Sequence, residues 1–164
     1  MKTSVVIFSG IAATSVMTLF SYMASRATGR NFNEPELLAD MATKLLPQQQ
    51  KALGKPAGWS FHYSIGTIWA LTFREALKIT KRKPASMNAL LGGVTSGAIG
   101  TIVWHAIFKV HPEPPRIPHR SFYIQLMAAH VVYSLSFAAL LQREKKNRLA
   151  YRRLIRQNFS RISL

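Results

Sequence analysis

Cysteine is absent from this chain of 164 residues. Its absence excludes disulfide bonds, thiolate nucleophiles, and zinc or iron–sulfur sites held by cysteine. Acidic residues are scarce as well: six Asp and Glu stand against 22 Lys and Arg, so the formal net charge is +16. Such an excess of positive charge indicates a polyanionic partner, either nucleic acid or anionic lipid.

The sequence also lacks the common catalytic motifs. It contains no G-x-S-x-G, no P-loop, no G-x-G-x-x-G after a predicted strand, and no pair of carboxylates inside an apolar segment. Glu75 is expected to be the only acidic residue close to a membrane span, and its spacing from Lys78 predicts a surface salt bridge. We therefore assign no catalytic residue and expect a protein that is not an enzyme.

Four long segments carry little or no formal charge, at about residues 3–25, 57–78, 87–108 and 121–142. A helix as long as the third segment spans about 33 Å, enough for a hydrocarbon core of about 30 Å. In that segment Gly93, Gly97 and Gly100 recur at helical spacing, which predicts close packing against another helix. The sequence thus predicts an all-α fold, a four-helix transmembrane bundle over residues 1–142.

A polar connection joins the first two segments and has a structure of its own. Asn33 is a predicted N-cap, Glu36 stands at the capping-box position, and a short surface helix is expected at about residues 34–46. Its apolar face consists of Leu37, Leu38, Met41 and Leu45. This amphipathic pattern predicts a helix that lies on the membrane surface or over the mouth of the bundle.

The distribution of positive charge predicts the orientation. The N-terminus, the 74–83 turn and the basic amphipathic tail at 143–164 together hold fourteen Lys and Arg, whereas the loops of the other side hold eight. The positive-inside rule then places both termini in the cytoplasm. We expect a multi-pass protein of the bacterial cytoplasmic (inner) membrane.

Two of the predicted spans share a pattern at a constant offset of 68 residues. His62, Gly66, Trp69 and Phe73 correspond in this way to His130, Ser134, Phe137 and Leu141. The correspondence predicts a helical hairpin used twice in the same orientation, with pseudo-twofold symmetry along the membrane normal.

With these features the chain resembles a group of small, poorly characterised bacterial inner-membrane proteins with four helices. The resemblance covers roughly residues 9–141. It rests on Gly10-x-x-Ala13-Thr14-x-x-Met17-Thr18, His62-x-x-x-Gly66, the glycine-rich third span, and His130-x-x-Tyr133. It implies a fold and a location and carries no established activity.

Histidines are the candidates for intramembrane chemistry, because an ionisable residue within a span is a functional candidate by default. His62 and His130 either hydrogen-bond across helices or serve as paired axial ligands of a b-type haem. A transition-metal site is the other alternative, built from His105, His111, Glu113 and His119. No dense ligand spacing such as H-x-x-x-H supports either cofactor, so hydrogen bonding is favoured and no cofactor is expected.

The tail after residue 142 is the candidate contact with lipid or a partner. Its cations include Arg143, Lys145, Lys146, Arg148, Arg152, Arg153 and Arg156. The tether to a membrane span favours anionic headgroups or other membrane subunits over nucleic acid. The expected function is an accessory, scaffold or assembly subunit of a larger membrane complex. The alternatives are a His-ligated metal or haem protein and a small transporter or channel.

Overall fold

The computed structural model describes residues 2–162, with side chains described through residue 151 and at residue 155. The predicted all-α class is confirmed, since the described residues form helices and no strand. The elements are α1 (Thr3–Thr28), α2 (Glu34–Leu45), the 3₁₀ helix η1 (Gln48–Leu53), α3 (Gly54–Ile79), α4 (Ser86–Val110) and α5 (His119–Ile162).

Three of the described helices are long and apolar enough to cross a membrane: α1, α4, and α5 over His119–Tyr151. Large apolar side chains cover their outer faces, such as Phe8 at 71%, Ile102 at 69% and Ile124 at 65% exposure. Contiguous apolar surface of this kind is rare on water-soluble monomers and suits a lipid surrounding. The structure thus supports the prediction of a membrane protein. The fourth predicted span, α3, is not one of the three.

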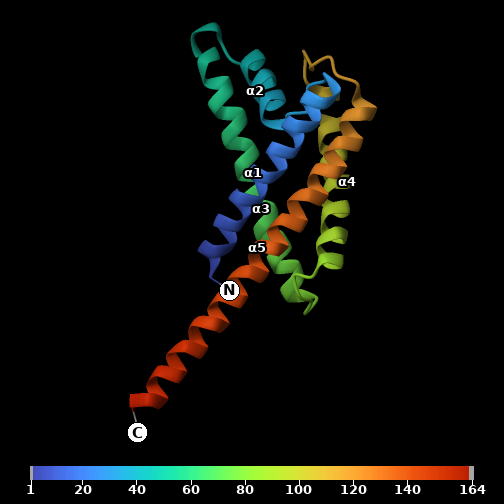
Figure 1. Ribbon diagram of the computed structural model, residues 1–164. Coiled ribbons are helices and arrows are strands. Elements are labelled where there is room, and N and C mark those ends of the chain that lie inside the picture. The colour runs from blue at the N-terminus through green and yellow to red at the C-terminus, as the bar shows by residue number, and fades with distance from the viewer. Residues whose placement is uncertain (1, 163–164) are drawn as a thin grey trace.

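The helices form a row rather than a closed ring (Figure 1). The long helix α5 packs extensively against α4 on one side and α1 on the other, and α1 in turn packs against α3. The ring of Phe73 in α3 lies against Gly92 of α4, and beyond this contact the two helices diverge toward the opposite end of the molecule. The N-terminus, the α3–α4 turn and the distal part of α5 share one end of the molecule, as the orientation argument requires.

Glycines allow the closest helix contacts. A Cβ atom added at Gly93 of α4 would lie 2.6 Å from Cα of Val131 in α5, and one at Gly10 of α1 would lie 2.6 Å from Cβ of Ala70 in α3. Real Cβ atoms do not approach other atoms so closely, so these positions admit glycine alone without movement of a helix. The close packing predicted for the glycine stripe of residues 93–100 is therefore confirmed, and its partner is α5.

The short helix α2 packs extensively against α3 and touches α1. Its residues Leu37 and Met41 are buried, as the predicted apolar face requires, whereas Leu45 is 61% exposed. Asn33 occupies the N-cap position, but its side chain makes no capping bond. The predicted capping box is wrong, because Glu36 instead accepts a hydrogen bond from the indole N–H of Trp59, at 3.1 Å.

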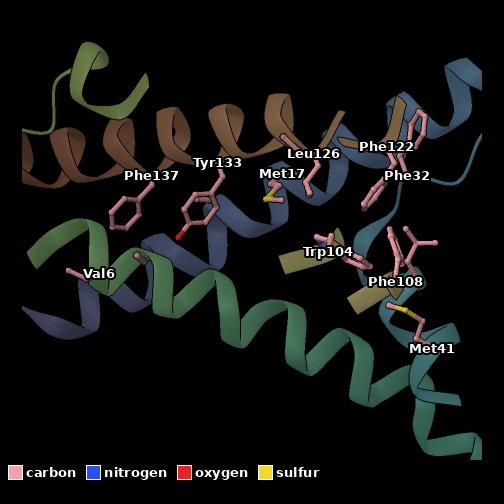
Figure 2. Close-up of a cluster of buried hydrophobic side chains, with 14 of the residues drawn as sticks. Val6, Met17, Phe32, Met41, Trp104, Phe108, Phe122, Leu126, Tyr133 and Phe137 are labelled. Atoms are coloured by element: carbon pink, nitrogen blue, oxygen red, sulfur yellow. The ribbon is translucent and has the colours of Figure 1, made fainter. Parts of the chain in front are cut away.

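Aromatic rings fill the core below α2. Trp104 and Phe108 of α4 lie with their ring centroids 5.1 Å apart, and Phe122 of α5 packs edge-on against Trp104, also at 5.1 Å. Figure 2 shows this cluster beside Phe32 and Met41, with Met17, Tyr133 and Phe137 further along the row. The cluster packs α4 against α5 at the end of the molecule where α3 diverges from α4.

The basic tail continues α5 without a break. The helix runs 44 residues to Ile162, so the change of composition at residue 142 is not a helix end, and the distal part stands off the body as an arm (Figure 1). Arg148 pairs with Glu144 at 3.0 Å, while Arg143, Lys145 and Lys146 are exposed. The predicted contact residues Arg152, Arg153 and Arg156 have side chains outside the described part.

Candidate functional site: a polar-lined cavity that opens between two helices

The divergence of α3 and α4 leaves a cavity of about 310 Å³. Apolar side chains of both helices form its sides, and Ile65, Ile68, Ile99 and Val103 among them are also 38–55% exposed. The cavity therefore opens sideways between α3 and α4, toward the region that lipid occupies in a membrane. Its polar lining is confined to a few groups: Thr14, Glu34, His62, His130 and Tyr133, with the indoles of Trp69 and Trp104.

His62 of α3 is held by a threonine of α1. Its Nε2 lies 2.9 Å from Oγ1 of Thr18, and that hydroxyl donates its single proton to the carbonyl of Thr14, also at 2.9 Å. The imidazole must then donate through Nε2–H, which leaves Nδ1 as the unprotonated nitrogen in the neutral ring. No described residue bonds to Nδ1.

His130 of α5 has the opposite tautomer, and it too is left with one unpaired acceptor nitrogen. Its Nδ1 lies 2.9 Å from the carbonyl oxygen of Leu126, one turn earlier, so Nδ1 carries the proton. Its Nε2 is left as an acceptor without a partner among the described residues. The missing side chain of Gly100 makes room for this nitrogen, since a Cβ there would lie 3.0 Å from it.

Tyr133 closes the inner wall. Its hydroxyl donates to the carbonyl oxygen of Gly66 at 2.5 Å, and Figure 2 shows the ring reaching from α5 toward α3. Gly66 is itself a close approach, because a Cβ there would collide with the Thr14 side chain of α1. Helices α1, α3 and α5 are thus locked together by small residues and one phenol directly beside the cavity.

Glu34, the first residue of α2, is fully buried at 1% exposure. Its Oε1 accepts a hydrogen bond from the Ser21 hydroxyl at 3.0 Å, and Ser21 accepts one from the Gln125 amide at 2.7 Å. The second carboxylate oxygen of Glu34 and the amide oxygen of Gln125 are buried without a partner among the described residues. Burial raises the pKa of Glu34 to about 7, and hydrogen bonds from its backbone, Ser21 and Gln125 oppose this shift without cancelling it.

The expectation that Glu75 is the only acid close to a span is therefore wrong, because Glu34 contacts Ser21 of α1. The predicted salt bridge of Glu75 itself is present: its carboxylate lies 3.1 Å from Lys78 and 2.6 Å from Arg74. The sequence analysis missed Glu34, Ser21 and Gln125. An amide at position 125, inside an apolar segment, is the one signal that pointed to a buried polar partner.

The predicted metal ligands are not brought together. The His105 ring lies 3.3 Å from the Tyr123 hydroxyl, and the His119 ring stacks on Phe108 at 5.0 Å. His111 uses both nitrogens, donating to the carbonyl of Met41 and accepting from the backbone N–H of Glu113. In the part of the chain that the structure describes, no three His, Asp or Glu side chains form a group that could hold a metal ion.

The two histidines proposed as haem ligands do share a site, since both line the cavity. The Nε2 atom of His62 is hydrogen-bonded to Thr18, and ligation of a haem by the pair stays a prediction. Each of these two histidines has one acceptor nitrogen without a partner among the described residues. Both residues belong to the small polar part of an otherwise apolar cavity. Comparisons with family models, with curated proteins and with solved structures found no match for this chain.

Proposed function

We propose that the chain is a four-span protein of the bacterial cytoplasmic membrane that binds an apolar small molecule taken from the bilayer. The single observation that carries this proposal is the cavity: about 310 Å³, apolar along its sides, open laterally between α3 and α4, and polar only around His62, His130 and Glu34. Ligand pockets have this composition, with a few polar groups that orient the molecule. A lateral opening suits a molecule that arrives from lipid rather than from water.

Retention of a ligand tests the proposal. We expect wild-type protein purified in mild detergent to retain an apolar molecule that organic extraction and mass spectrometry detect. Val103→Phe adds a ring to the cavity side and is expected to reduce the retained amount at least about fivefold, since overpacking a site costs about 1–3 kcal/mol. The matched control is Ile102→Phe, one residue away on the outer face. Equal retention by the two variants, or none by the wild type, contradicts the proposal.

Treating α3 as the fourth span is part of this proposal. Its 26 residues reach about 39 Å as a helix, more than the hydrocarbon core requires. The polar residues that lower its hydropathy include His62, which is buried inside the protein rather than exposed to lipid. The shared position of His62 and His130 at the cavity agrees with the repeated-hairpin hypothesis, which stays a prediction.

Single cysteines test the topology, because the natural chain has none. Gln50→Cys precedes α3 and Lys83→Cys follows it, and both positions are exposed. With both termini cytoplasmic, an impermeant maleimide added to intact cells is expected to label residue 50 and to reach residue 83 only after lysis. Labelling of both positions in intact cells, or of neither, contradicts a crossing by α3.

A second candidate function is an accessory subunit that contacts an acidic protein partner. The observation that favours it is the unbroken continuation of α5, which carries the cationic segment away from the other helices as an arm. We expect deletion of residues 143–164 to abolish co-purification of a partner in mild detergent while Ile102→Phe leaves it intact. Full-length protein that purifies alone contradicts this role.

A further inference from the structure

We infer that the ligand of the cavity carries a head group that donates hydrogen bonds, a hydroxyl or phenol on an apolar body. This inference rests on the proposed function and names the chemistry that the same site recognises. It follows from the tautomers of the two cavity histidines, which hydrogen bonds inside the protein dictate.

Each neutral imidazole donates its single N–H to a group of the protein. His62 donates from Nε2 to Thr18, whose own proton goes to the carbonyl of Thr14, and His130 donates from Nδ1 to the carbonyl of Leu126. The nitrogens that remain, Nδ1 of His62 and Nε2 of His130, are acceptors. Tyr133 adds no free donor, because its hydroxyl proton is engaged by the carbonyl of Gly66.

The two imidazoles therefore offer acceptors, and most of the rest of the lining is hydrocarbon. The indole N–H groups of Trp69 and Trp104 are the remaining donors of the lining. A hydroxyl satisfies an imidazole acceptor and leaves its own oxygen for one of these donors. An ether or ketone of the same shape leaves both imidazole nitrogens unpaired, and a site built for a hydroxyl discriminates against such analogues.

The small volume also restricts the apolar body. About 310 Å³ is at the lower end of ligand pockets, so the enclosed part is a ring or a short branched unit, and a longer chain would extend through the opening between α3 and α4. Exposed Ile68 and Ile99 line that exit. A lipid-soluble phenol or alcohol with an apolar tail has this outline.

A pair of probes tests the inference on the wild-type protein. Para-heptylphenol and para-heptylanisole differ by one methyl group that removes the donor, and quenching of Trp69 and Trp104 in detergent micelles reports occupancy. We expect the phenol to bind at least about tenfold more tightly, the effect of one unmade buried hydrogen bond. Equal affinities overturn the head-group inference and leave the cavity as a binding site, whereas no binding of either probe overturns the proposed function as well.

Variants assign the preference to the histidine. His130→Phe keeps a ring in place and is expected to lower the phenol-to-anisole ratio, because only the His62 acceptor remains. His105→Phe, at an exposed position outside the cavity, keeps the wild-type ratio. Circular dichroism confirms folding before the titrations. A His130→Phe protein that folds and retains the full preference contradicts the role of the Nε2 acceptor.

Discussion

Replacement of Gly93 by leucine is expected to lower the free energy of unfolding by about 3 kcal/mol and to detach α4 from α5. The reason is geometric. A Cβ at this position would lie 2.6 Å from Cα of Val131 and 3.0 Å from the carbonyl oxygen of His130. Both are backbone atoms of α5, so no side-chain rotation relieves the contact and the helices must separate.

The neighbouring position supplies the control. Val94 is 45% exposed on the outer face of α4, so Val94→Leu introduces the same side chain into lipid and is expected to change stability by less than about 0.5 kcal/mol. Reversible unfolding in mixed detergent micelles, followed by circular dichroism, measures both variants. Equal stabilities would mean that the α4–α5 contact contributes little to the fold.

Loss of the α4–α5 contact is also expected to impair ligand binding in the cavity. Ile99, Gly100 and Val103 of α4 form its wall, one to three turns beyond Gly93. A tilt of α4 at Gly93 moves these residues away from His130, so the Gly93→Leu protein is expected to lose the preference for para-heptylphenol along with stability. Val94→Leu should keep it.

The glycine stripe could be predicted from the sequence because its cause is local. In a helix without charges, glycines at helical spacing indicate that a neighbouring helix packs at close range. The same holds for α2, where the buried Leu37 and Met41 follow the predicted apolar face. Periodicity of this kind predicts which face of a helix is buried. It does not predict which other helix packs on that face.

Glu34 could not be predicted in this way. An acid in the first turn of a helix is ordinarily an exposed residue that favours the helix dipole, and the sequence around Glu34 fits that pattern. Its burial depends on α2 folding back so that its first residue reaches Ser21 of α1 and Gln125 of α5, residues separated by 104 positions. Only the tertiary arrangement brings these three together.

The spacing of the histidines along the sequence did not indicate which of them share a site. His62 and His130 line one cavity, whereas His105, His111 and His119 are each engaged by a different local group. The sequence pattern also did not predict where the last helix ends. The change to cationic composition at residue 143 marks a change of surroundings, and the α-helix continues through it.

The contribution of Glu34 to stability is expected to fall by about 3 kcal/mol as the pH rises from about 4.5 to about 8.5. The sign follows from the raised pKa. With a pKa of about 7 in the folded protein against an ordinary value of 4.5, the folded state binds the proton more tightly than the unfolded state. Its contribution is complete below the ordinary value and is lost as the pH rises through about 7.

The hydrogen bonds explain why the proton is preferred. Ionised Glu34 accepts a hydrogen bond from Ser21 on Oε1, whereas Oε2 and the amide oxygen of Gln125 are two buried acceptors without a donor among the described residues. A proton on Oε2 turns one of these acceptors into a donor. The carboxyl group then joins α1, α2 and α5 without an uncompensated charge in the interior.

Glu34→Gln supplies a permanent substitute for the protonated form. The amide N–H₂ replaces the acid O–H, so we expect the variant to match the wild type at about pH 4.5 and to exceed its stability by about 3 kcal/mol at about pH 8.5. Glu113→Gln, on an exposed loop, should follow the wild-type curve at every pH. Unfolding in mixed micelles over this pH range, compared between variants, separates Glu34 from the histidines that share the cavity. If Glu34→Gln and the wild type lose stability in parallel, the proton is held elsewhere, and α2 is fastened to the bundle by its apolar face alone.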